Sequence, residues 1–278
     1  MIMQIKRIDL ADYAEGFETK AHVDLYLCED SYEYSHHIRP LVVICPGGGY
    51  TLTSDREAEP IARVFLARGY HAAVLRYTCR NEDGTAIAPK PLYEAALTVK
   101  LLRSRAEEYN IAPENIAING YSAGGHLAAS LSCLYNDEAL LSPIGVTAEQ
   151  CRPNASVLCY PVITADPACS HEGSFINLLG NERTEEQMKF WSLENRVGAH
   201  VPPTFIWHTA DDSCVPIENS LRYALALSRS GVNFEYHVFP HGVHGLSTAG
   251  GETYPSPVYP VTRWMSMCTD WLSGFFRF

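Results

Sequence analysis

Hydrophobic and polar positions alternate in two different ways along the chain. Residues 22–30 alternate at every second position, as in a half-buried strand, whereas residues 40–48 form a nearly continuous β-branched run that ends in glycines. Residues 55–68 have an acidic start and apolar residues spaced for one helical face, and residues 70–78 again have the pattern of a strand. The run at 40–48 therefore predicts a strand that is buried on both faces.

The same order of strand and helix continues through the rest of the chain. The pattern predicts a helix from about 92 to 109, a short strand at 115–120 and a helix of small residues directly after it. Further strands are predicted at 155–163, 203–209 and 233–240, and further helices after Pro216 and from about Val261 to the end of the chain. This alternation predicts an α/β fold with a mostly parallel twisted sheet and helices on both faces.

One longer polar segment interrupts this alternation. Between residues 164 and 200, Pro167, Gly173 and Gly180 break up weak helical patterns. We expect this segment to leave the sheet and to cover one end of it, as a cap or lid. Because no repeat or flexible linker separates two halves, the sequence predicts a single domain over residues 1–278.

Composition and charge narrow the classes of function. The chain has 278 residues, 46% hydrophobic and 19% charged, which suits a globular core. Its formal net charge of −11 would repel phosphate backbones and anionic lipid, so neither nucleic acid nor a membrane is an expected partner. With no segment resembling a secretion signal or a membrane span, we expect a soluble, cytoplasmic protein. Nine cysteines without a CxxC pair predict free thiols.

The most specific motif is the GxSxG sequence at residues 120–124. It lies between a predicted strand and a predicted helix, and it is centred on Ser122. A sharp strand-to-helix turn leaves no room for a Cβ at the flanking positions, and it exposes the serine hydroxyl at the end of the strand. Ser122 is therefore the candidate nucleophile.

A serine nucleophile needs a histidine and a carboxylate, which are expected later in the chain. Asp211 and Asp212 follow one predicted strand, and His241 and His244 follow the next. Only one residue of each pair can serve, and the glycine after His244 suits a tightly turning loop. These residues offer no third ligand at metal-binding spacing, so we predict neither a metal nor a cofactor.

Acyl transfer also needs hydrogen-bond donors for the negative oxygen that forms on the substrate. Three glycines, Gly47, Gly48 and Gly49, follow the buried strand PLVVIC (40–45), and they leave their backbone amides unobstructed. The amides of Gly48 and Gly49, together with the amide of Ala123 after the nucleophile, are the predicted oxyanion hole.

These motifs resemble the α/β-hydrolase superfamily, and in particular its bacterial acetyl xylan esterase and feruloyl esterase branch. The resemblance rests on the runs CPGGGY (45–50), SDREAEPIA (54–62), GYSAGGHLA (120–128), WHTADDSCVPIENSL (207–221) and FPHGVHGL (239–246). It implies that Asp212 is the acid and His244 the base of a Ser-His-Asp triad. Pro46 stands where the wider HGGG lipase motif has histidine, a change that leaves the oxyanion amides in place.

The resemblance implies hydrolysis of small acyl esters, mainly acetyl, on xylan-derived oligosaccharides. A feruloyl esterase and a generic carboxylesterase are the alternatives within this class. Tyr50, Phe175 and Trp191 are candidates to line the acyl or sugar pocket, because flat rings stack on sugar faces. The expected partner is thus a small-molecule ester, and a homodimer is left open.

Two other classes share parts of the pattern. A serine peptidase of the prolyl oligopeptidase type uses the same triad, but a chain of 278 residues has no room for its propeller domain. A noncatalytic small-molecule receptor would usually have lost a triad member, whereas this sequence retains candidates for all three. Both are therefore ranked below the esterase.

Overall fold

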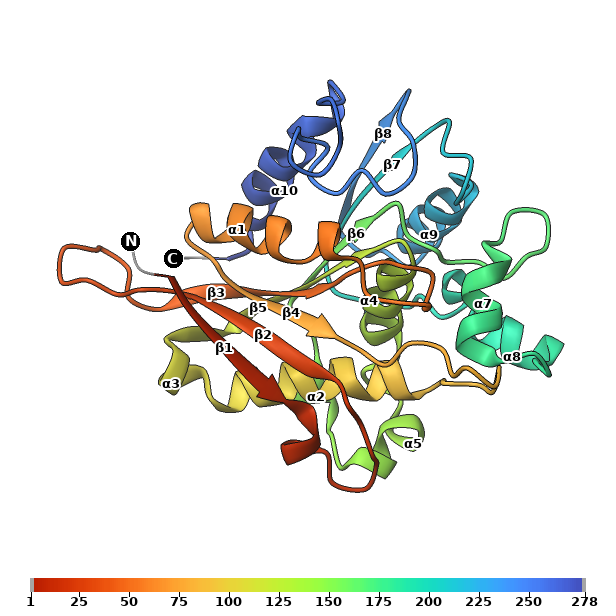
Figure 1. Cartoon of the computed structure of the whole chain (residues 1–278), viewed down its shortest axis with the longest axis horizontal. Helices are drawn as coiled ribbons and strands as arrows, with labels where there is room; N and C mark the ends of the chain where they lie inside the picture. The colour runs from red at the N-terminus through yellow and green to blue at the C-terminus, as the bar shows by residue number, and fades with distance from the viewer. Residues whose placement is uncertain (1–2, 277–278) are drawn as a thin grey trace.

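The computed structural model describes residues 3–276, and its framework is an eight-stranded sheet (Figure 1). The strand order is β1-β2-β4-β3-β5-β6-β7-β8. The strands are β1 (Met3–Asp9), β2 (His22–Cys28), β3 (Arg39–Cys45), β4 (His71–Arg76), β5 (Ile111–Tyr121), β6 (Ala155–Cys159), β7 (Thr204–Thr209) and β8 (Phe234–Phe239). Strands β1 and β2 and strands β2 and β4 pair antiparallel, and all other neighbours pair parallel. The predicted mostly parallel α/β fold is confirmed.

Helices cover both faces of this sheet. The α-helices are α1 (Glu59–Ala67), α2 (Lys90–Ser104), α3 (Ala106–Tyr109), α4 (Ala123–Leu134), α5 (Glu138–Leu141), α6 (Ala148–Cys151), α7 (Glu172–Leu179), α8 (Glu185–Phe190), α9 (Glu218–Arg229) and α10 (Trp264–Ser273). Short 3-10 turns lie at Leu10–Tyr13, Asp55–Glu57, Ser142–Ile144, Leu193–Asn195 and Val261–Arg263. In Figure 1, α1 and α10 lie above the sheet, whereas α2 and α3 lie below it.

The residues of β3 explain why the central strands are so apolar. Leu41, Val43 and Cys45 belong to the core that the sheet forms with α2, α4 and α9, whereas Val42 and Ile44 belong to the core with α1 and α10. Successive side chains of a strand point to opposite faces, so a strand between two layers of helices needs apolar residues at every position.

The observed elements differ from the predicted ones at several places, including the end of β6, which stops at Cys159 although a strand was expected to 163. Strand β1 was not predicted, because at the edge of the sheet it mixes charged and apolar residues without a clean alternation. The helix expected over 92–109 is divided at Arg105 into α2 and α3. The helix expected over 55–68 begins as a 3-10 turn, and α1 follows with Pro60 in its first turn, where a missing N–H does no harm.

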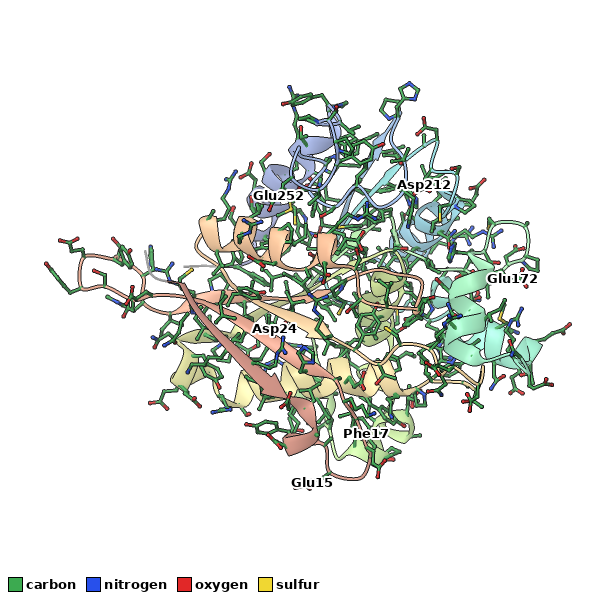
Figure 2. All side chains as sticks on the ribbon, in the orientation of Figure 1. Glu15, Phe17, Asp24, Glu172, Asp212 and Glu252 are labelled. Atoms are coloured by element: carbon green, nitrogen blue, oxygen red, sulfur yellow. The ribbon has the colours of Figure 1, made fainter. Side chains whose placement is uncertain are left out.

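Residues 164–200, called the cap segment below, lie between β6 and β7 in the chain. They carry α7 and α8, and in Figure 2 Glu172 of this segment lies on the same side of the molecule as Asp212. Asn177 fixes the segment to the loop after β3: its Nδ2 donates to the carbonyl oxygen of Gly49 at 2.8 Å and to the hydroxyl of Thr51 at 2.9 Å. Within residues 3–276, every helix is too short or too polar to cross a membrane.

Candidate active site

Ser122 occupies a one-residue turn between a strand and a helix. Strand β5 ends at Tyr121 and α4 begins at Ala123, so Ser122 alone makes the change of direction. Its backbone has φ 53° and ψ −119°, a conformation that L-residues rarely adopt. The turn places the hydroxyl at the carboxyl end of a central strand, which is the edge where parallel sheets hold their sites.

The two glycines of the motif are required by close backbone approaches. A Cβ on Gly120 would lie 2.1 Å from the carbonyl oxygen of Gly124. A Cβ on Gly124 would in turn lie 2.1 Å from the carbonyl oxygen of Cys45 and 2.3 Å from that of Pro46. Neither position therefore accepts a side chain, and helix α4 packs directly against the loop after β3.

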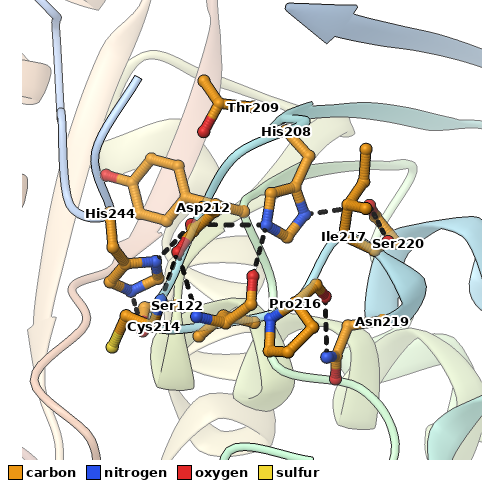
Figure 3. Close-up of polar contacts among 12 residues, drawn as sticks. Ser122, His208, Thr209, Asp212, Cys214, Pro216, Ile217, Asn219, Ser220 and His244 are labelled. Carbon is orange, nitrogen blue, oxygen red and sulfur yellow. Dashed lines mark hydrogen bonds and ion pairs between the residues drawn. The ribbon is translucent and has the colours of Figure 1, made fainter. Parts of the chain in front are cut away.

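A continuous line of hydrogen bonds joins Ser122, His244 and Asp212 (Figure 3). The Oγ of Ser122 lies 2.8 Å from Nε2 of His244, and Nδ1 of His244 lies 2.7 Å from Oδ2 of Asp212. Because a carboxylate only accepts, Nδ1 carries the proton of the neutral ring, and Nε2 is free to accept the serine hydroxyl proton. The geometry is that of a nucleophile, a base and the group that orients the base.

Asp212 is held in its ionised form. Its side chain is fully buried, and its Oδ1 accepts the N–H groups of Cys214 at 2.9 Å and of Val215 at 3.0 Å. Nε2 of His208 lies 3.4 Å from its Oδ2. Burial raises the pKa of Asp212, but the hydrogen bonds from His208, His244 and the backbone outweigh that effect, and the net pKa lies well below the usual range.

The neighbouring pair, Asp211 and His241, lies outside this line. Nδ1 of His241 is 3.0 Å from Oδ2 of Asp211, and the N–H of Gly242 donates to Oδ1 of the same carboxylate at 2.8 Å. The His241 side chain is 85% exposed. The structure thus brings Asp212 and His244 to Ser122, and it pairs Asp211 with His241 at the surface.

The glycines after β3 lie against the nucleophile. A Cβ on Gly47 would be 3.0 Å from the Cβ of Ser122. Gly48 and Gly49 have φ angles of +123° and +63°, a region that favours glycine. Ala123 begins α4, so its N–H is one of the first four amides of the helix, which have no partner within it. The turn at 46–49, called the oxyanion turn below for the role proposed for it, therefore lies beside Ser122 and the start of α4.

The three predicted aromatic pocket residues are buried around His126. Tyr50, Phe175 and Trp191 are 1%, 1% and 7% exposed. The hydroxyl of Tyr50 lies 2.9 Å from Nδ1 of His126, and the Nε2–H of His126 donates to the carbonyl oxygen of Trp191 at 2.9 Å. Rings this deeply buried offer no open face to a sugar. They join the oxyanion turn, α4 and the cap segment instead.

His126 and two other polar residues beside the site carry no local sequence signal that predicts a role for them. His171, in the cap segment, lies against the oxyanion turn: a Cβ on Gly49 would be 3.9 Å from its Cε1. Its Nδ1 accepts from the N–H and the hydroxyl of Ser174, at 3.3 and 2.8 Å, so its proton resides on Nε2. Burial lowers the pKa of His171. The third residue is Glu57, whose carboxylate is buried behind the site. It belongs to the sequence SDREAEPIA, which contributed to the family resemblance but predicted no role for Glu57.

Over residues 3–276, no group of three or more His, Cys, Asp and Glu side chains could hold a metal ion.

Comparisons with known proteins place this chain in a family. A family model described as BD-FAE matches residues 23–227. The endo-1,4-beta-xylanase B of Butyrivibrio fibrisolvens is 37% identical over 216 residues, which are 78% of this chain and 34% of that protein. The acetylxylan esterase of Xylanibacter ruminicola is 33% identical over 210 residues, which are 74% of this chain and 40% of that protein. The chain thus spans about a third of the length of the first of these curated relatives and about two fifths of the length of the second.

A solved structure matches over almost its full length. The acetyl ester-xyloside bifunctional hydrolase of Caldicellulosiruptor lactoaceticus is 35% identical and superposes with a TM-score of 0.84. The match covers 98% of this chain and 97% of that one.

Proposed function

The chain belongs to the BD-FAE family of α/β-hydrolases, and from that premise we propose that it is a carboxylic ester hydrolase in which Ser122, His244 and Asp212 act as nucleophile, base and acid. The observation that carries the proposal is the hydrogen-bonded line from the Ser122 hydroxyl through His244 to the Asp212 carboxylate. All three groups follow the carboxyl ends of parallel strands, at the edge of the sheet where α/β proteins hold their sites.

In the first half of the reaction, the oxygen of Ser122 attacks the ester carbonyl carbon while Nε2 of His244 takes the hydroxyl proton. Asp212 stabilises the imidazolium that forms, and it keeps the ring in the required orientation. His244 then gives the proton to the alcohol oxygen, the C–O bond of the ester breaks, and the acyl group remains on Ser122. Water, activated by His244, releases the acid in the second half.

The amides of Gly48, Gly49 and Ala123 stabilise the negative oxygen in both halves. Backbone N–H groups suit this task because they are fixed before the reaction and need no reorganisation as charge develops. Support comes from the approach of the oxyanion turn to Ser122 and from the positive φ angles of its glycines. The N-terminal end of α4 adds its partial positive charge at the same place.

We infer that the substrates are small acyl esters, mainly acetyl, of xylan-derived oligosaccharides. The support is the acetylxylan esterase among the relatives and the acetyl ester-xyloside hydrolase among the solved structures. Feruloyl esters and unrelated carboxylic esters are the alternatives.

The test is hydrolysis of three esters by the wild type and the Ser122→Ala variant: acetylated xylo-oligosaccharides, 4-nitrophenyl acetate and methyl ferulate. We expect rapid acetate release from the sugar substrate and its loss in Ser122→Ala, with the folded state retained. Cleavage of 4-nitrophenyl acetate alone would leave the triad in place but remove the sugar-ester claim. A Ser122→Ala variant that retains substantial activity would refute the assigned nucleophile.

A further inference from the structure

A buried carboxylate that the proposed reaction does not use lies directly behind the site. Glu57 is only 2% exposed, although carboxylates are rarely buried without a reason. Its Oε2 accepts the N–H of Gly47, in the oxyanion turn, at 2.8 Å. Its Oε1 accepts the hydroxyl of Tyr160, the residue after β6, at 2.7 Å. The side chain therefore joins two loops at the carboxyl edge of the sheet.

Tyr160 extends this connection to the loop that carries His244. The Tyr160 oxygen accepts the backbone N–H of Ser247 at 2.9 Å, and its ring packs edge-on against the His244 ring with 5.0 Å between centroids. The Ser247 hydroxyl also donates to the carbonyl oxygen of Arg56, the residue before Glu57. The loop after β8 is thus bonded both to Tyr160 and to the turn that contains Glu57.

Burial raises the pKa of Glu57, whereas its hydrogen bonds from Tyr160 and Gly47 favour the ionised form. Since Tyr160 accepts from Ser247, its own hydroxyl proton goes to Glu57, and Gly47 donates to the other carboxylate oxygen. A proton on either oxygen would face a donor. The charge lies close to the base, since a Cβ on Gly245, the residue after His244, would be 4.0 Å from Oε1.

We propose that Glu57 is a positioning residue that sets the oxyanion turn and His244 at the distance the reaction needs. The oxyanion turn follows β3 and His244 follows β8, and three strands, β5, β6 and β7, separate these two strands in the sheet. Strand pairing therefore provides no direct link between the two loops. The chain of contacts from Gly47 through Glu57 and Tyr160 to Ser247 provides that link. This inference rests on the proposed esterase reaction.

The test replaces Glu57 by glutamine, which has nearly the same shape but only one acceptor oxygen. Gly47 and Tyr160 both donate, so one of the two loops loses its partner. Displacing a catalytic group by about 1 Å can cost about a hundredfold in rate. We expect Glu57→Gln to lower kcat on 4-nitrophenyl acetate by about 10-fold to 100-fold with KM within about twofold, as for an interaction that matters in the transition state. Labelling of Ser122 by a fluorophosphonate should slow by the same factor.

A matched control comes from the other fully buried glutamate. Glu94 is 0% exposed and accepts hydrogen bonds from Thr19 and Thr78, on a part of α2 that has no bond to the triad. Glu94→Gln should lower the melting temperature while kcat and the labelling rate stay at wild-type values. A decrease in kcat as large as that of Glu57→Gln would mean that any buried-charge defect slows the enzyme, and it would overturn the proposal.

A second variant tests the link if Glu57→Gln does not fold. Tyr160→Phe removes only the hydroxyl between Glu57 and Ser247, and we expect it to lower kcat and the labelling rate by about tenfold. Wild-type rates in Tyr160→Phe would overturn the proposal. The esterase assignment and the role of Glu57 can be refuted separately. A wild type that neither reacts with the fluorophosphonate nor hydrolyses esters would refute the esterase assignment. If the wild type is labelled and Glu57→Gln and Tyr160→Phe are labelled and turn over substrate at the wild-type rate, only the role of Glu57 is refuted.

Discussion

Acidification should destabilise the folded protein through His126, which lies between the oxyanion turn and the cap segment. Its Nε2–H donates to the carbonyl oxygen of Trp191, so in the neutral ring Nδ1 is bare and accepts the Tyr50 hydroxyl. Burial lowers the pKa of His126 to about 4, from an ordinary value near 6.5. In a protonated ring, Nδ1 would also be a donor and could no longer accept the Tyr50 hydroxyl. The ring would then carry an unpaired charge in a residue that is only 1% exposed.

The size of the effect follows from linkage. Between about pH 6.5 and pH 4, the unfolded chain binds a proton at this histidine and the folded chain does not, so stability decreases as the pH falls. For these two pKa values, the loss between about pH 7 and pH 5 is about 2 kcal/mol. His71, 1% exposed, is the matched case: burial lowers its pKa to about 4 as well, so it contributes a similar amount. Together the two histidines should cost about 4 kcal/mol over this range.

The measurement is urea unfolding of the wild type, His126→Gln and His71→Gln at about pH 7 and pH 5. Each variant lacks one of the two titrating groups, so the difference in unfolding free energy between the two pH values should decrease by about 2 kcal/mol in each. The absolute stability of a variant does not affect this comparison, because the measured quantity is the change in unfolding free energy of each protein between the two pH values. An unchanged pH dependence in His126→Gln would refute the argument that this ring is held neutral.

Three further predictions concern the site. Asp212→Asn should lower kcat by about 10⁴-fold, because the His244 ring would lose its required tautomer. Asp211→Asn should change kcat by no more than about twofold. Equal effects of the two substitutions in steady-state kinetics would contradict the assignment of Asp212 as the acid. Gly124→Ala should prevent folding, since the added Cβ would meet the Cys45 carbonyl oxygen at 2.1 Å; a soluble variant with a normal melting curve would disprove this. His171→Ala should lower kcat/KM by about tenfold, because the variant would lose one hydrogen bond from the Nε2–H of His171 to the ester. Unaltered kinetics would show that His171 does not contact the substrate.

Local pattern was enough to predict the elements that carry the site. The strands expected at 203–209 and 233–240 correspond to β7 (Thr204–Thr209) and β8 (Phe234–Phe239) within a residue at each end. Strand β5 starts earlier than the short strand expected at 115–120, because residues 112–115 are half-buried or exposed and carry no periodic signal. The turn that holds Ser122, the proposed nucleophile, was also predictable from local sequence, since both of its glycines are required by contacts within a few residues or with one adjacent loop.

The roles of the supporting residues Glu57 and His126 could not be predicted from the local sequence pattern, because their partners are distant in sequence. The hydroxyl that bonds Glu57 comes from a tyrosine 103 residues later, and the hydroxyl that bonds His126 comes from a tyrosine 76 residues earlier. In one sequence, a buried glutamate in a helix-start segment is indistinguishable from an ordinary charged residue. Without the family resemblance, which implied Asp212, the choice between Asp211 and Asp212 was open because adjacent residues share every local property. In the folded loop, the Asp212 side chain is fully buried and that of Asp211 is exposed.

The backbone of Ser122 also limits which nucleophiles could replace it during evolution. Threonine would supply the same hydroxyl, but its second substituent on Cβ makes a φ of 53° strongly unfavourable. Cysteine and aspartate have a single substituent at that position, and aspartate is among the residues that best tolerate positive φ. The turn that exposes the hydroxyl therefore leaves substitution routes open towards thiol or carboxylate chemistry and closes the route to threonine.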